Sequence, residues 1–128
     1  MITIVPKDIL EEAVMLHGHL GPFLVLGLKI GLKAKNIMAM PVCEVSTVLK
    51  KPYVCVVDGL KTVVGDNVVL RDGDGLSARF SNGKDSIIIN VRRSIVDRYA
   101  ATPWEKCEEN AYEVMNSSDE ELFENCNF

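Results

Sequence analysis

The two histidines of the chain, His17 and His19, lie one residue apart in the hexapeptide His-Gly-His-Leu-Gly-Pro of residues 17–22. Imidazole nitrogens bind transition metals and exchange protons near neutral pH. Residues two apart diverge on a helix, so both rings can face one centre only where the backbone turns. Gly18 permits such a turn and suits the C-terminal cap of a helix that ends at His17, where the left-handed conformation favours glycine. The hexapeptide is therefore the first candidate for a chemical site.

A second group of metal-ligating side chains lies further along the chain. Cys55 and Asp58 are three residues apart in a segment with helical periodicity, so both can face one centre. Asp66 adds a carboxylate at the other end of that segment. Imidazole, thiolate and carboxylate together suit a divalent transition metal, zinc being one candidate. The expected metal-ligating residues are His17, His19, Cys55, Asp58 and Asp66.

Two other interpretations of these residues stay open. Cys55 could be a nucleophile whose pKa is lowered by the amino end of the helix and by one of the histidines. Alternatively, a core histidine, a buried Cys55 and a turn-forming Asp58 would have structural roles alone. Of the other cysteines, we assign Cys43 to the core, and Cys107 and Cys126 to unreactive positions on C-terminal helices.

Composition and charge are those of a small globular protein. The 128 residues are 48% hydrophobic and 25% charged, which suits one core and argues against disorder. The net charge of −4, with no basic stripe, predicts no nucleic-acid binding. Lysines and glycines interrupt the apolar stretch 20–40, so no membrane span is expected. The absence of C-x-x-C pairs and of a signal-peptide pattern favours reduced thiols in the cytoplasm.

Hydrophobic periodicity predicts one α+β domain over residues 1–128, with an α-β-α-β-β-β core and a largely antiparallel four-stranded sheet. We expect helices at 8–17, 22–36 and within 52–65, strands at 42–49, 67–71, 76–81 and 84–91, and C-terminal helices after residue 92.

Local signals refine these elements. Asp8 with Glu11, and Ser118 with Glu121, have the spacing of capping boxes. Segments 72–75 and 81–84 predict hairpin turns, and the isoleucines of 84–91 predict a central strand buried on both faces. The last helix is expected to begin at Pro103, with Trp104 packing it onto the body. Gly27 and Gly31, four residues apart, predict a helix face that another backbone approaches closely.

Two of these segments together resemble a known family. Residues 17–22, followed by Gly27 and Gly31, resemble the H-G-H-x-C-P-G motif in the E-type subunit of formylmethanofuran dehydrogenase. Residues 55–61, Cys-Val-Val-Asp-Gly-Leu-Lys, then Gly65, resemble its second motif, C-x-x-D-G-(I/V)-Q followed by G-C-T. The resemblance covers essentially the whole chain, including the closing segment 119–123, but not the zinc-finger domain that follows the core in many members.

This resemblance implies a fold like the C-terminal domain of glyceraldehyde-3-phosphate dehydrogenase. It also implies a homodimer, with the glycine-bearing helix and the motif region near the interface. His17, His19, Cys55 and Asp58 match the two motifs and carry over as metal-site residues. Gly21 and Asp66 stand where the family has cysteines. Fewer thiolates shift the site toward harder, weaker metal binding, or remove it.

The leading hypothesis is thus a small metal-site protein, an accessory component of the one-carbon metabolism that reduces carbon dioxide to a formyl group in methanogenesis. A larger oxidoreductase complex is the implied partner. His17 and Cys55 are the expected ligands, His19 binds or supports them, and Asp58 or Asp66 completes or orients the set. One alternative is a free-standing enzyme with Cys55 or a metal-bound water as nucleophile in a cleft at a dimer interface. The other is an interaction module that kept the fold and lost the site.

Overall fold

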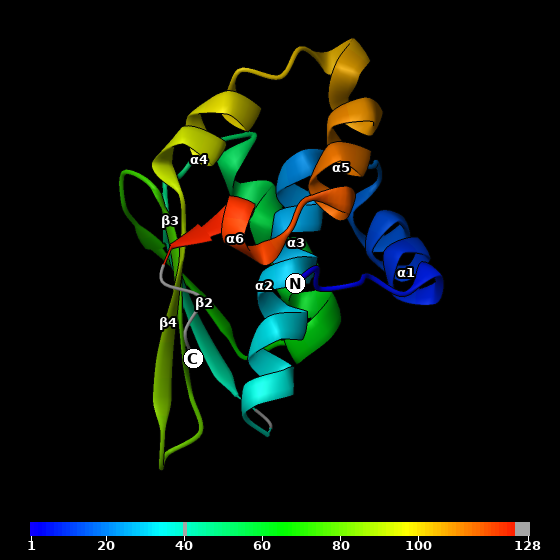
Figure 1. The fold of residues 1–128 in the computed structure, drawn as a ribbon. Coiled ribbons are helices and arrows are strands. Elements are labelled where there is room, and N and C mark those ends of the chain that lie inside the picture. Colours follow the sequence, from blue (N-terminus) through cyan, green and yellow to red (C-terminus); the bar gives the residue numbers. More distant parts are fainter. Residues whose placement is uncertain (40, 125–128) are drawn as a thin grey trace.

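The computed structural model describes residues 1–39 and 41–124 of the chain. Helices pack on one face of a mixed five-stranded sheet, which confirms the α+β class (Figure 1). The elements are α1 (Lys7–His17), α2 (Pro22–Ile37), β1 (Val42–Thr47), α3 (Val56–Val64), β2 (Val68–Asp72), β3 (Leu76–Ser81), β4 (Ser86–Val91), α4 (Arg93–Ala100), α5 (Cys107–Asn116), α6 (Asp119–Leu122) and β5 (Phe123–Glu124). Short 3₁₀ helices, Tyr53–Cys55 and Trp104–Lys106, lead into α3 and α5.

The strand order in the sheet is β2-β1-β3-β4-β5. The pair β1–β2 is parallel and the other pairs are antiparallel, so the sheet is largely antiparallel as predicted. It has five strands rather than four, because the two-residue β5 returns from the C-terminal region to pair with β4.

The two predicted hairpin turns have different outcomes. Segment 81–84 does join the antiparallel neighbours β3 and β4, and the Asn82 side chain accepts hydrogen bonds from the amides of Lys84 and Asp85. Segment 72–75 is not a hairpin turn, because β1 lies between β2 and β3. It passes around the end of β1 instead: the Gly73 amide donates to the Thr47 carbonyl, and the Thr47 hydroxyl donates to the Gly75 carbonyl.

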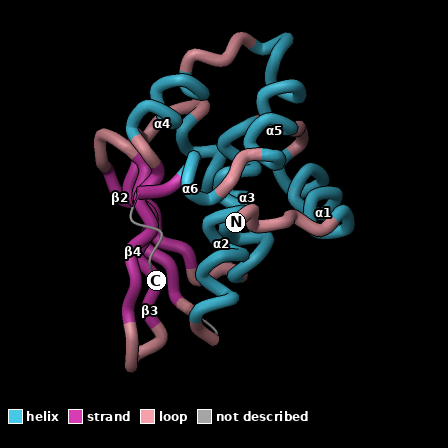
Figure 2. Tube along the Cα trace, viewed as in Figure 1, coloured by secondary structure: helices cyan, strands magenta, loops and turns pink. Residues whose placement is uncertain are grey.

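The core lies between the sheet and the helices, and buried side chains of both form one cluster. Figure 2 colours the strands and the helices separately. Alternate residues of the strands face it, and Val45 and Phe80 are fully buried there. The predicted burial of β4 on both faces is wrong, because helices cover one face of the sheet. Ile89 is buried, whereas Ile88 is 53% exposed on the opposite face. Within the described ranges, no helix is long and apolar enough to cross a membrane.

Helices α2 and α3 pack at unusually close range, as the glycine spacing predicts. A Cβ atom on Gly27 would collide with the carbonyl oxygen of Val56, and one on Gly59 with the carbonyl oxygen of Leu24. A Cβ on Gly31 would lie 2.9 Å from Cβ of Val63. The glycine face of α2 is therefore covered by α3 of the same chain, and a dimer would have to use another surface.

The helix ends test the predicted capping signals. Ser118 and Glu121 form the expected capping box of α6. The box predicted from Asp8 and Glu11 is absent, because Pro6 occupies the N-cap of α1 and no side chain caps it. Pro103 precedes the 3₁₀ helix Trp104–Lys106, so the last long helix begins later than predicted.

A buried polar cluster ties the C-terminal segment to the N-terminal segment and to α2. Asp119 accepts hydrogen bonds from the amide and hydroxyl of Thr3, at 3.0 and 2.9 Å, and from the Lys33 amine at 2.9 Å. Burial alone would raise the pKa of Asp119, but these hydrogen bonds outweigh it and lower that pKa. Nearby, the buried Lys29 amine donates to the Ser117 carbonyl at 2.8 Å.

Candidate metal site

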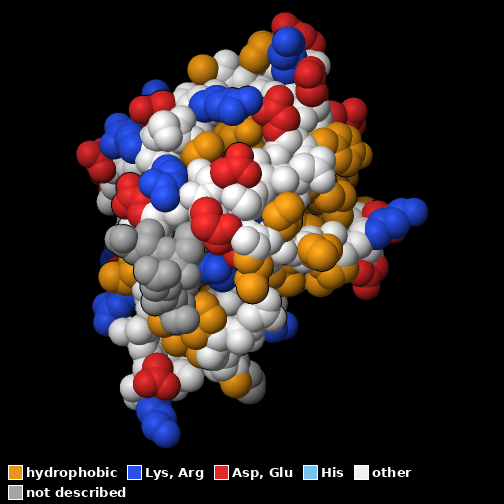
Figure 3. Space-filling view, viewed as in Figure 1, with side chains coloured by type: hydrophobic (Ala, Val, Ile, Leu, Met, Phe, Trp, Pro, Cys, Tyr) orange, Lys and Arg blue, Asp and Glu red, His pale blue; other side chains and the backbone are white. Residues whose placement is uncertain are grey.

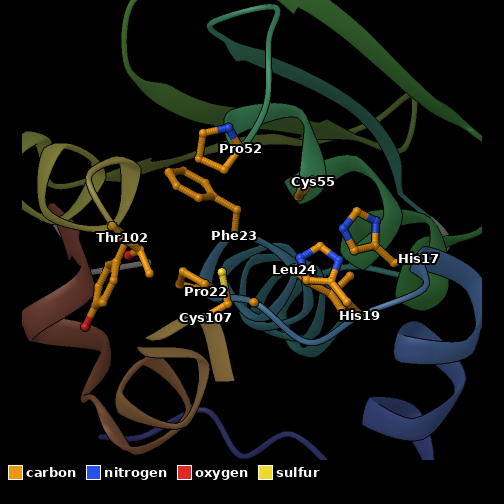
Figure 4. A pocket seen from close by; sticks show the side chains of 11 residues that line it. His17, His19, Pro22, Phe23, Leu24, Pro52, Cys55, Thr102 and Cys107 are labelled. Carbon is orange, nitrogen blue, oxygen red and sulfur yellow. The ribbon is translucent and has the colours of Figure 1, made fainter. Parts of the chain in front are cut away.

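The site begins where α1 ends. Gly18 has a φ of 102°, in the left-handed region, and its amide donates to the Val14 carbonyl. This is the glycine cap predicted from the sequence. It turns the chain so that the rings of His17 and His19 lie side by side, with centroids 4.8 Å apart (Figure 4). The pair thus converges in the way that an uninterrupted helix would forbid.

His17 is held by a carboxylate from α3. Its Nδ1 atom lies 2.7 Å from Oδ2 of Asp58, in the first turn of that helix. When Nδ1 carries the proton and donates it to Asp58, the Nε2 atom of the neutral ring keeps a free lone pair. That Nε2 atom is buried and has no hydrogen-bond partner. A fixed imidazole with one unsatisfied nitrogen is suited to bind a metal or to act as a general base.

Cys55 faces the same cavity as the two histidines. It ends the 3₁₀ helix that leads into α3 and is 9% exposed. All three side chains line an inner cavity of about 40 Å³ and also an outer one of about 410 Å³. A water needs roughly 10–15 Å³ of such space, so the inner cavity has room for an ion with a water ligand.

The walls of the cavity are mostly apolar. Phe23, at the start of α2, packs against Tyr53 with ring centroids 5.4 Å apart. Trp104 was expected to pack the last helix onto the body, but it is 73% exposed. Its ring instead lies 5.0 Å from that of His19, at the rim of the outer cavity. Lys51 lines the same outer cavity and supplies a positive charge there.

Burial sets the protonation of the site. The pKa of His19 is lowered by burial and by the neighbouring charges of His17 and Lys51, which favours the neutral ring that a metal requires. The pKa of Cys55 is raised, chiefly by burial, although Lys51 opposes the shift. The lowered pKa expected for a nucleophilic Cys55 is therefore not found. Without a metal this thiol keeps its proton at neutral pH.

The five predicted site residues divide into three groups. His17, His19 and Cys55 line one cavity. Asp58 holds His17 from behind without lining that cavity, which fits the orienting role rather than that of a ligand. Asp66 is exposed beyond the opposite end of α3, and a helix of nine residues is about 14 Å long. The structure therefore does not bring Asp66 to the site.

Sequence reasoning missed one residue of the cavity. Cys107, which was expected to be unreactive, lines both its inner and its outer part. It is the first residue of α5 and lies far along the chain from Cys55. No local spacing links the two cysteines, so only the tertiary arrangement reveals them as neighbours. Cys126 lies outside the described residues.

The donors do not yet have the geometry that an ion requires. Across residues 1–39 and 41–124, no three His, Cys, Asp or Glu side chains stand close enough together to coordinate one ion in the observed side-chain conformations. The donors surround the cavity but do not converge on its centre. Rotation between staggered conformers moves a thiol sulfur by about 3 Å. The donor types thus fit a transition metal, and rotation of the side chains would have to bring them within bonding distance of one ion.

Comparison with known proteins adds no relative to this picture. No model of a known protein family matches the chain, and no curated protein is significantly similar to it.

Proposed function

We propose that this chain is a small metal-site protein that holds a divalent transition metal between His17, His19 and Cys55. The observation that carries the proposal is the buried, unpartnered Nε2 atom of His17. A buried polar atom without a partner costs about 1–3 kcal/mol, so folded proteins rarely keep one without a use. A metal ion in the adjoining cavity would take up its lone pair.

The contact between Asp58 and His17 supports a bound metal at Nε2 of His17 rather than a bound water or a purely structural role for the ring. Ligating histidines in metal sites usually donate their other ring N–H to a carboxylate, which fixes the ring and raises its basicity. Asp58 makes this contact at 2.7 Å. The donors are two imidazoles and a thiol, a set that suits zinc better than magnesium or calcium. A zinc ion bound there would be a structural centre or a Lewis acid.

The resemblance to the E-type subunit of formylmethanofuran dehydrogenase supplies the proposed setting: an accessory component of the one-carbon metabolism that converts carbon dioxide to a formyl group. Within that setting we propose a cytoplasmic protein with a second copy of itself and a larger oxidoreductase as partners. The three cysteines that the structure describes are all free thiols, in keeping with a reducing compartment. Exposed apolar side chains, among them Met15, Leu16 and Tyr112, offer surface for such contacts.

Hydrophobic side chains gather toward the right of the view in Figure 3, where Figure 1 places α1 and α5. The mass of the protein in solution tests the homodimer directly. A monomer at working concentration would contradict it. Capture of a large partner by metal-free protein from native extract would favour the interaction module instead.

Elemental analysis of the purified, untagged protein tests the metal site. We expect the wild type to carry stoichiometric zinc or another divalent transition metal, and His17→Ala and Cys55→Ser to lose most of it. Cys43→Ala is the matched control, since Cys43 is a fully buried thiol of the sheet that does not line the cavity. Unchanged metal content in both site variants would end the proposal.

One observation favours a second candidate, a cysteine-dependent enzyme. The His17–Asp58 pair has the geometry of a general base held by its orienting acid, and Cys55 shares their cavity. The raised pKa of Cys55 and the absence of a hydrogen bond from its thiol to His17 speak against it. Selective alkylation of Cys55 at neutral pH, much faster than that of Cys107, would favour the enzyme.

A further inference from the structure

Three donors leave a zinc site one ligand short of the usual four, and the cavity holds a further thiol. Cys107 lines both the inner and the outer part of it, together with His17, His19 and Cys55. In Figure 4 its sulfur points into the cavity from the α5 side, whereas Cys55 approaches from the α3 side. The two cysteines thus line the cavity from separate elements of the fold.

No strong contact of its own holds the Cys107 thiol. The hydrogen bond recorded for it is a weak one, from Sγ to the Pro103 carbonyl at 3.9 Å. A thiol bond of that length is readily exchanged for a metal–sulfur bond near about 2.3 Å. Cys107 is only partly buried, at the first position of α5.

Gly21 adds no side chain to the inner cavity beside His19. A Cβ atom at this position would lie 3.4 Å from Nε2 of His19, so any larger side chain here would stand directly against that ring. Gly21 and Cys107 line the same inner cavity. No side chain at position 21 therefore takes up part of this cavity.

We propose that Cys107 is the fourth ligand of the site, which would then hold its metal by two thiolates and two imidazoles. This inference rests on the metal site proposed above and extends it to the C-terminal third of the chain. Two thiolates and two neutral imidazoles balance the charge of a divalent ion, which suits the apolar walls of the cavity.

Cobalt(II) substitution tests the proposal with a spectroscopic readout. Thiolate ligands give Co²⁺ near-ultraviolet charge-transfer absorption in proportion to their number. We expect Cys107→Ser and Cys55→Ser each to bind Co²⁺ with about half the wild-type charge-transfer intensity and with weakened affinity. Cys43→Ala should keep the full intensity. Wild-type intensity in Cys107→Ser, with the charge-transfer band lost in Cys55→Ser, would overturn this inference and leave the three-residue site standing. Failure of the wild type to bind Co²⁺ or Zn²⁺ would instead remove the metal site itself.

Alkylation of the wild-type protein gives a second measurement that does not depend on a variant folding. Saturating Zn²⁺ should slow the reaction of iodoacetamide with both Cys55 and Cys107, as measured by peptide mass spectrometry. Protection of Cys55 alone would contradict the role of Cys107. Protection of neither thiol would count against the metal site as a whole.

Discussion

The Nδ1 atom of His17 lies 2.7 Å from Oδ2 of Asp58, and this contact joins the last residue of α1 to the first turn of α3. It has two consequences for the imidazole. The ring is fixed in orientation, and in the neutral ring a proton on Nδ1 that is donated to Asp58 leaves the buried Nε2 atom as an acceptor beside the cavity.

Substitution of Asp58 should weaken metal binding without removing a ligand. We expect Asp58→Ala to lower zinc affinity by about 10–100-fold, because the His17 ring loses both its orientation and its added basicity. Asp66→Ala is the matched control, an exposed carboxylate at the far end of the same helix. Isothermal titration with Zn²⁺ measures both variants. An equal loss of zinc affinity in the two variants would mean that the His17–Asp58 contact plays no part in metal binding.

Metal affinity should rise steeply with pH. Burial raises the pKa of Cys55 and also that of Cys107, so each thiol must lose a proton before it binds metal at neutral pH. Each such proton adds about a tenfold gain in affinity per pH unit below the thiol pKa values.

With two thiolate ligands, zinc affinity should therefore increase about a hundredfold between about pH 7 and 8, and about tenfold in Cys107→Ser. Competition with a chelator of known pH dependence measures both slopes. A wild-type slope equal to that of Cys107→Ser would show that only one thiol loses its proton on binding.

Alanine at Gly27 should destabilise the whole fold. Its Cβ would collide with the Val56 carbonyl, a backbone atom that can move only if α3 moves with it. Overpacking of this kind costs about 1–3 kcal/mol and exceeds the gain of up to about 1 kcal/mol in helix propensity. Gly31→Ala should cost less, because its Cβ meets the side chain of Val63, which can adjust. Urea unfolding measures both, and the reverse order would be evidence against close packing at Gly27.

The Asp119 cluster should make the fold sensitive to acid. Hydrogen bonds from Lys33 and Thr3 hold the pKa of Asp119 below its usual value despite burial, so its contribution to stability is full above the unfolded-state pKa of about 4. That contribution is lost as the pH falls through the lower, folded-state pKa.

Asp119→Asn should therefore lower the free energy of unfolding at neutral pH by about 3 kcal/mol, the usual cost of breaking a buried pair. Its stability should also fall less steeply on acidification than that of the wild type. Glu120→Gln is the matched control, because Glu120 is the exposed neighbour that pairs with the N-terminus. It should change the free energy of unfolding little. Denaturation at a series of pH values measures the free energy of unfolding of all three proteins. If that free energy fell equally with acidification in the wild type and in Asp119→Asn, Asp119 would not be the source of the acid sensitivity.

The sequence predicted those features that depend on a few neighbouring residues. Gly18 as a left-handed cap and the Ser118 capping box are both confirmed, because each follows from local backbone chemistry. The convergence of the two histidine rings belongs here too, since it needs only the turn at Gly18.

Features that depend on distant segments were missed. The parallel pairing of β1 and β2 places β3 on the far side of β1, which no turn signal in segment 72–75 could reveal. Cys107 reaches the cavity because the 3₁₀ helix before α5 brings it there, so its own surroundings in the sequence look inert. Asp66 was assigned to the site by its motif position, but a full helix separates it from Cys55.

The tight contact between α2 and α3 also bears on how far this protein can change over evolution. Gly59 follows Asp58 directly, and Gly27 lies opposite it on α2. A bulkier residue at either position would drive the helices apart and carry the carboxylate and the Cys55 thiol away from both rings. Any descendant that retains the chemistry should therefore retain these two small residues, even though neither one touches the cavity.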